Sequence, residues 1–76
     1  MNLDERRFMS NHEAPQGQIY ICGACGKRSR DVYGSNKIDR GWDASCMMNS
    51  VLVYENSIVM ENGRVTAANA VEKESS

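Results

Sequence analysis

The chain has 76 residues, of which 41% are hydrophobic and 25% are charged, and its formal net charge is -1. These values are typical of one small globular domain, and they exclude a multidomain enzyme, a doubly wound nucleotide-binding fold and a collagen-like chain. A chain of this length buries only about 60% of the surface that it exposes when unfolded, so a metal, a disulfide or a partner subunit usually supplements its core.

The start of the chain predicts a flexible arm over residues 1–17. Residues 3–9 can form one or two helical turns, but Pro15 and the polar residues before it prevent continuation. The charged residues 4–7 do not resemble a secretory signal. An odd number of cysteines, three, is also unlike a disulfide framework. We therefore expect a cytoplasmic protein with free or metal-bound thiols, and one without a membrane span, because no apolar run approaches the required length of about 20 residues.

A single domain is expected over residues 18–68, beginning with a strand at residues 18–21 that leads directly into Cys22. Residues 29–33 can return as a second strand, and Gly34 begins the turn that ends it. Strand, turn and strand would together form a small hairpin.

A helix is predicted to begin after Asp43, whose carboxylate can accept a hydrogen bond from a backbone N–H of the first turn. Met47, Val51 and Tyr54 continue at helical spacing, so we expect the helix to reach about Tyr54. The β-branched residues in the same segment favour a strand instead, which is the alternative.

Asn62-Gly63 is the strongest hairpin signal in the chain, because both residues tolerate the positive φ of a type I′ turn. Residues 69–76 contain little to bury and predict a frayed tail. The fold class expected from these elements is α+β, with a C-terminal β-hairpin.

The three cysteines are the leading candidates for metal ligands. Cys22 and Cys25 form a C-x-x-C pair, and 20 residues separate Cys25 from Cys46. This spacing is typical of a second zinc-ligand pair, although Asn49 occupies its fourth position. The sequence therefore predicts a structural Zn²⁺ bound by three cysteines and a further donor.

Zinc in a closed structural site has four ligands, so this donor comes from the chain, from water or from another molecule. His12, the only histidine, is the first candidate, and Asp43 is the second. In the alternative interpretation Cys46 is an ordinary core cysteine and the C-x-x-C pair has no ligand role. A redox role is less favoured, because a thioredoxin-like βαβ unit needs a longer chain.

Cys22-x-x-Cys25-Gly26-Lys27, followed by Cys46 at a helix start, resembles the N-terminal four-cysteine zinc finger of ClpX-type unfoldase subunits. The resemblance covers about residues 20–55 and implies a treble-clef fold that binds substrates and adaptor proteins. Asn49, where that family has cysteine, is the departure. The small size also resembles proteins encoded by tailed bacteriophages.

Five cations lie within residues 27–40, a segment with a charge of about +3. They are Lys27, Arg28, Arg30, Lys37 and Arg40. Together with Trp42, which is either a core residue or an interface residue, they are predicted to contact a protein partner, for instance a larger host complex. Nucleic-acid binding through the same segment is the alternative, and a homodimer is compatible with the sequence. A chain this small rarely encloses a catalytic pocket, so we do not expect an enzyme.

Overall fold

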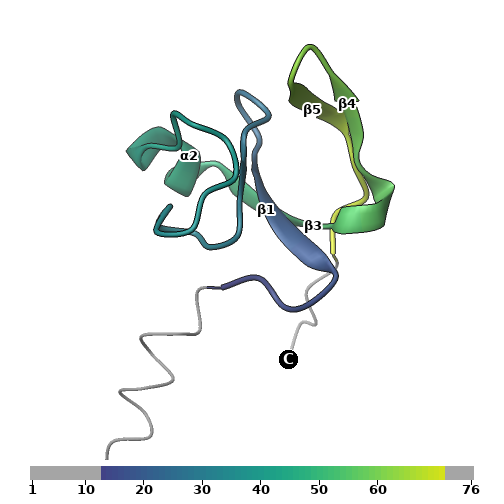
Figure 1. Cartoon of the computed structure of the whole chain (residues 1–76), viewed down its shortest axis with the longest axis horizontal. Helices are drawn as coiled ribbons and strands as arrows, with labels where there is room; N and C mark the ends of the chain where they lie inside the picture. The colour runs from purple at the N-terminus through teal and green to yellow at the C-terminus, as the bar shows by residue number, and fades with distance from the viewer. Residues whose placement is uncertain (1–12, 72–76) are drawn as a thin grey trace, which may run out of the picture.

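A computed structural model of the protein describes residues 13–71 (Figure 1). The expected α+β class with a C-terminal hairpin is confirmed. The strands are β1 (Gln18–Cys22), β2 (Arg28–Ser29), β3 (Ser50–Tyr54), β4 (Val59–Glu61) and β5 (Arg64–Ala67). The helices are α2 (Ala44–Met48) and the short 3-10 helix η1 (Glu55–Ser57).

The central sheet has the order β2-β1-β3, and both of its strand pairs are antiparallel. Side chains alternate between the two faces of a strand, so β1 contributes to two different clusters. Ile19 and Ile21 pack with Val53 on one face. Tyr20 and Cys22 lie on the other face, in a cluster that includes Trp42 and Cys46. In Figure 1 the hairpin β4–β5 stands on one side of β1 and α2 on the other.

The helix ends at Met48, so its predicted extension to Tyr54 is wrong, and residues 50–54 form β3 instead. Asn49 caps the helix end, because its side-chain amide donates to the carbonyl oxygen of Ser45 at 2.8 Å. All five residues of β3 then pair with β1. Pairing along the whole strand, together with burial of Val53, outweighs the helical spacing of the apolar residues.

The second strand is shorter than the predicted 29–33 and comprises only Arg28–Ser29. The backbone N–H of Asp31 donates to the Ser29 hydroxyl rather than to a neighbouring strand. The Asp31 carboxylate also accepts a hydrogen bond from the Ser35 backbone N–H at 2.9 Å, which turns the chain away from the sheet.

The predicted hairpin at Asn62-Gly63 is confirmed, and the two residues have φ values of 55° and 80°. The hairpin also contacts the loop that carries the first two cysteines. The Val65 backbone N–H donates to the Gly26 carbonyl oxygen at 3.0 Å. A β-carbon at Gly26 would lie 2.6 Å from the Val65 carbonyl oxygen, so this close approach needs glycine.

Parts of both predicted terminal segments are hydrogen-bonded to the domain. In the arm, the Ala14 N–H donates to the Arg30 carbonyl, and the Gly17 carbonyl accepts from Glu55. In the tail, residues 69–71 run along the free edge of β3, where the Val71 N–H donates to the Leu52 carbonyl at 2.8 Å. Residues 1–12 and 72–76, and with them His12, lie outside the described residues.

Candidate metal centre

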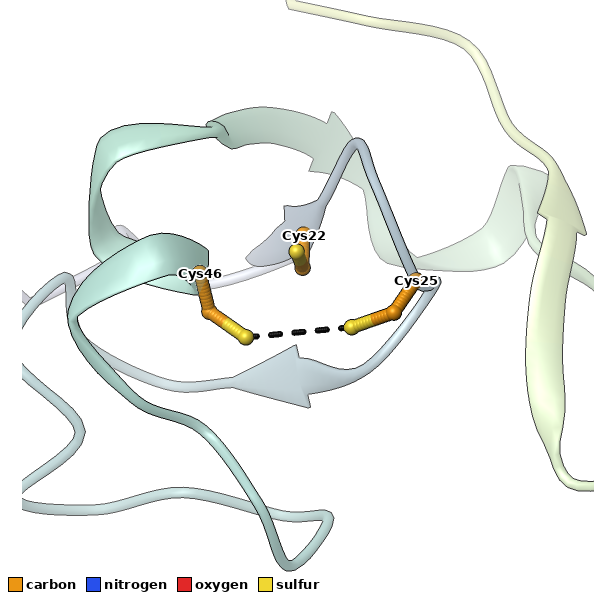
Figure 2. A group of neighbouring side chains, drawn as sticks. All are labelled: Cys22, Cys25 and Cys46. Atoms are coloured by element: carbon orange, nitrogen blue, oxygen red, sulfur yellow. Dashed lines mark hydrogen bonds between the residues drawn. The ribbon is translucent and has the colours of Figure 1, made fainter.

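Three structural elements bring the cysteine side chains together (Figure 2). Cys22 is the last residue of β1, Cys25 lies in the following turn, and Cys46 lies in α2. The turn is closed by the Gly26 N–H, which donates to the Cys22 carbonyl at 2.7 Å. The Cys22 N–H in turn donates to the Lys27 carbonyl at 2.8 Å. This segment is therefore a short, tightly hydrogen-bonded knuckle.

Asp43 positions the third thiol, as its predicted role of helix N-cap implies. Its carboxylate accepts a hydrogen bond from the Cys46 backbone N–H at 3.1 Å, which confirms the cap. The cap fixes the start of α2 and holds Cys46 in the first helical turn, where its side chain points toward the knuckle.

The spacing of the sulfur atoms suits a metal ion. All three Sγ atoms lie within 4.8 Å of one another, and those of Cys25 and Cys46 are 3.7 Å apart. Tetrahedral zinc with Zn–S bonds of about 2.3 Å places its sulfur ligands about 3.8 Å from each other. A disulfide would need sulfur atoms about 2.05 Å apart, and the three cysteines are free. Small movements would therefore bring the three thiolates into a zinc coordination sphere.

The thiols differ in their electrostatic surroundings. Cys22 and Cys46 are 1% and 3% exposed, and Cys25 is partly exposed. Burial raises the pKa of the Cys46 thiol to about 12. Burial also acts to raise the pKa of Cys22, but hydrogen bonds from the Ala24 backbone and from neighbouring thiols outweigh it and lower that pKa. A bound cation would replace the thiol protons and stabilise the thiolates of this buried cluster.

Trp42 belongs to the core beside the cysteines rather than to a binding surface. Its side chain is 8% exposed and packs in the cluster with Cys22 and Cys46. Its indole N–H donates to the Val32 carbonyl at 2.9 Å. A β-carbon at Gly34 would lie 2.6 Å from the Trp42 ring. The loop that contains Tyr33 and Gly34 therefore folds closely over the indole. Of the two predicted roles for Trp42, the structure supports the core role.

Among residues 13–71, the potential ligands that converge are the three cysteines. The carboxylate of Asp43 is engaged as the helix cap. The amide of Asn49 donates to Ser45 at the other end of the same helix. His12 lies outside the described residues, so the first candidate for the fourth ligand stays a prediction.

The cations of the predicted basic segment differ in their contacts. Arg28 forms a bidentate ion pair with Asp39, and Arg30 pairs with Glu55 at 2.9 Å. Lys27 and Arg40 instead line a groove beside Cys25. Arg64 is a third cation of this groove. It could not be predicted from the sequence, because only the contact between hairpin and knuckle brings it near the basic segment.

The chain was also compared with known proteins. No protein-family model, curated protein or solved structure matches it. Within the part of the chain that the structure describes, no helix is long and apolar enough to cross a membrane. Since no known protein matches the chain, the role of the cysteine cluster is inferred from its geometry.

Proposed function

We propose that the protein is a small zinc-binding module in which the metal has a structural role and which acts by binding another protein. The convergence of three cysteine sulfurs within 4.8 Å carries this proposal. Three thiolates are soft donors and favour zinc over the hard cations that prefer oxygen ligands. His12 is our candidate for the fourth donor, which would close the coordination sphere as in structural zinc sites.

A structural role follows from what the cysteines connect. Cys46 is held in a helix of five residues, which is too short to be stable without tertiary contacts. Within the part of the chain that the structure describes, the hydrophobic core on the other face of the sheet has three buried residues. A metal that joins the helix to the knuckle would supply folding free energy that this small core lacks.

Protein binding is the function implied by the resemblance to ClpX-type fingers. Since Trp42 is buried, we place the contact instead on exposed apolar side chains near the metal centre. Met48, at the end of α2, is 81% exposed, and Tyr33, in the loop over Trp42, is 57% exposed. Burial of such side chains against a partner is a common source of binding free energy.

Cobalt substitution tests the metal site directly. Co²⁺ bound tetrahedrally by thiolates has intense visible absorption bands, which we expect for the wild type and which Zn²⁺ should abolish by displacement. Circular dichroism should show loss of structure with a chelator and recovery with added zinc.

Two variants separate metal binding from helix stability. Cys25→Ser should lose the absorption bands, because it removes one thiolate. Asn49→Ala removes the hydrogen bond at the end of α2 without touching a thiol, and it should retain the bands. A wild type that gives no thiolate bands and an unchanged dichroism spectrum with chelator would contradict the proposal.

A further inference from the structure

A groove of about 330 Å³ lies between the knuckle, the loop before α2 and the tip of the β4–β5 hairpin. Three cationic side chains, one from each segment, line it. They are Lys27, Arg40 and Arg64. Cys25 and Asn62 also line the groove, so it begins at the partly exposed edge of the cysteine cluster.

One backbone hydrogen bond and one side-chain contact bring the segments that carry these three cations together. The hydrogen bond between Val65 and Gly26 joins the residue after Arg64 to the residue before Lys27. The Lys27 side chain crosses the backbone beside Arg40, since its Cε lies 2.6 Å from where a β-carbon of Gly41 would be. The fold therefore brings the three segments that carry these cations next to one another, although Arg40 and Arg64 themselves are exposed.

The groove has an excess of positive charge. Asp39, the one carboxylate that the described residues contribute to the lining, accepts hydrogen bonds from the Arg28 backbone N–H, Nε and Nη2 at 2.9–3.1 Å. Among residues 13–71, no carboxylate lies within ion-pair distance of Lys27, Arg40 or Arg64. Lys27 also acts electrostatically on Asp39, although not within ion-pair distance. Three cations against one carboxylate that Arg28 already neutralises leave the lining positively charged, and such a lining attracts an anion with several charges.

The lining also indicates which anion. The forked N–H groups of the two arginine guanidinium groups match the arrangement of the oxygen atoms in a phosphate. Among residues 13–71, the lining includes no aromatic or large apolar side chain on which a base would stack. A mononucleotide would therefore leave its base in solvent, whereas a nucleic-acid strand supplies several adjacent phosphates and needs no base contact.

We propose that this groove binds the phosphate groups of a nucleic-acid strand, without reading its sequence, through Lys27, Arg40 and Arg64. This function goes beyond the proposed metal module and changes the set of residues expected from the sequence. Arg28 and Arg30 are used in intramolecular ion pairs, and Arg64 replaces them.

Fluorescence anisotropy with a labelled single-stranded DNA of mixed sequence tests the proposal across a series of salt concentrations. Each phosphate contact contributes about 0.7 to the slope of log affinity against log salt. The double variant R40Q/R64Q should therefore lower the steepness of this slope by about 1.4, and equally for different sequences. The control R30Q/K37Q changes the net charge by the same amount outside the groove and should retain the wild-type slope.

Equal loss of slope in both double variants, or no binding by the wild type, would overturn the proposal. Displacement of the DNA by polyglutamate at equal charge concentration would also overturn it, in favour of an acidic protein ligand. Zinc content is measured for every variant, so that failure of the groove and failure of the metal site are distinguishable. Amide chemical shifts of the wild type give a test without mutation, because added DNA should shift residues 27, 40 and 64 more than residues 30 and 37.

Discussion

Asp43 shows how a single side chain can position a candidate metal ligand through the backbone. Its carboxylate starts α2 and accepts a hydrogen bond from the Cys46 backbone, and these contacts lower the pKa of Asp43. The same side chain was the second candidate for the fourth zinc ligand. The cap gives this acidic residue, three positions before Cys46, a role that does not require coordination to a metal.

Two substitutions at Asp43 distinguish these roles. Asn is also a good N-cap, so Asp43→Asn should bind zinc with nearly the wild-type affinity. Asp43→Ala removes the cap that orients Cys46 and should weaken zinc binding about tenfold, as loss of a supporting contact commonly does. Competition with a chromophoric chelator measures both affinities. Strong loss of affinity in Asp43→Asn would instead identify the carboxylate as a ligand.

The ion pair between Arg28 and Asp39 makes the stability of the protein depend on pH. Hydrogen bonds from Arg28 hold the pKa of the Asp39 carboxyl below its ordinary value of about 3.9. Because the folded pKa is lowered, this pair stabilises the protein above about pH 3.9, and the contribution is lost as pH falls through the folded pKa.

A ¹³C NMR titration of the Asp39 carboxyl group should give a midpoint below 3.9 in the wild type. The midpoint should rise in Arg28→Gln, which removes the guanidinium. Arg30→Gln removes a cation that pairs with Glu55 and should leave the titration unchanged. An equal shift in both variants would show that general charge, rather than the direct ion pair, sets the pKa of Asp39.

At the scale of the elements, the sequence predicts best where local chemistry decides. The strand before Cys22, the cap at Asp43 and the turn at Asn62-Gly63 depend on residues adjacent in sequence, and all three are present. The identity of residues 50–54 depends on pairing with β1, more than 25 positions earlier, and periodicity alone gave the wrong element.

In the candidate site, too, local spacing could be predicted from the sequence and long-range contacts could not. Spacing was sufficient to predict that Cys22, Cys25 and Cys46 belong together, because the ligand pairs of small zinc sites have restricted separations. The burial of Trp42 and the contribution of Arg64 depend on how loops fold over the sheet. No local pattern in the sequence encodes those contacts.

The contact between hairpin and knuckle gives a prediction with a matched control. Gly26 and Gly63 both have φ of 80°, but only a β-carbon at Gly26 would collide with a neighbouring backbone. Gly63→Ala should cost only backbone strain, about 1–2 kcal/mol. Gly26→Ala should cost more, because the hairpin must also move away from the knuckle. Urea unfolding of the zinc-loaded variants measures the free energy of unfolding of each. Equal losses of this free energy in the two variants would contradict the close contact at Gly26.

For the whole molecule, β1 divides the interior into two small clusters with different means of support. The cluster of Ile19, Ile21 and Val53 is supported by hydrophobic packing. Val65 of the hairpin and the flanking residues Ile58 and Ala68 pack against it. The cluster of Trp42 and the cysteines contains three polar thiols, two of them buried, and would gain most from a bound metal. Removal of zinc should therefore disorder α2 and the loop over Trp42 before it affects the pairing of β1 with β3.

Hydrogen exchange on the metal-free protein checks this order of events. Amides of α2 should lose protection when the metal is removed, while amides in the ladder between β1 and β3 retain more of theirs. A uniform loss of amide protection across both clusters would mean that they unfold as one cooperative unit. Full protection in α2 without metal would show that the helix needs no such support.

Native mass spectrometry of the purified chain shows whether Cys22, Cys25 and Cys46 bind a zinc ion. We expect one zinc per chain in the wild type, none in Cys46→Ser and a weakened complex in His12→Ala. A wild-type protein that is folded and carries no zinc, even after incubation with the metal, would contradict the proposed zinc site.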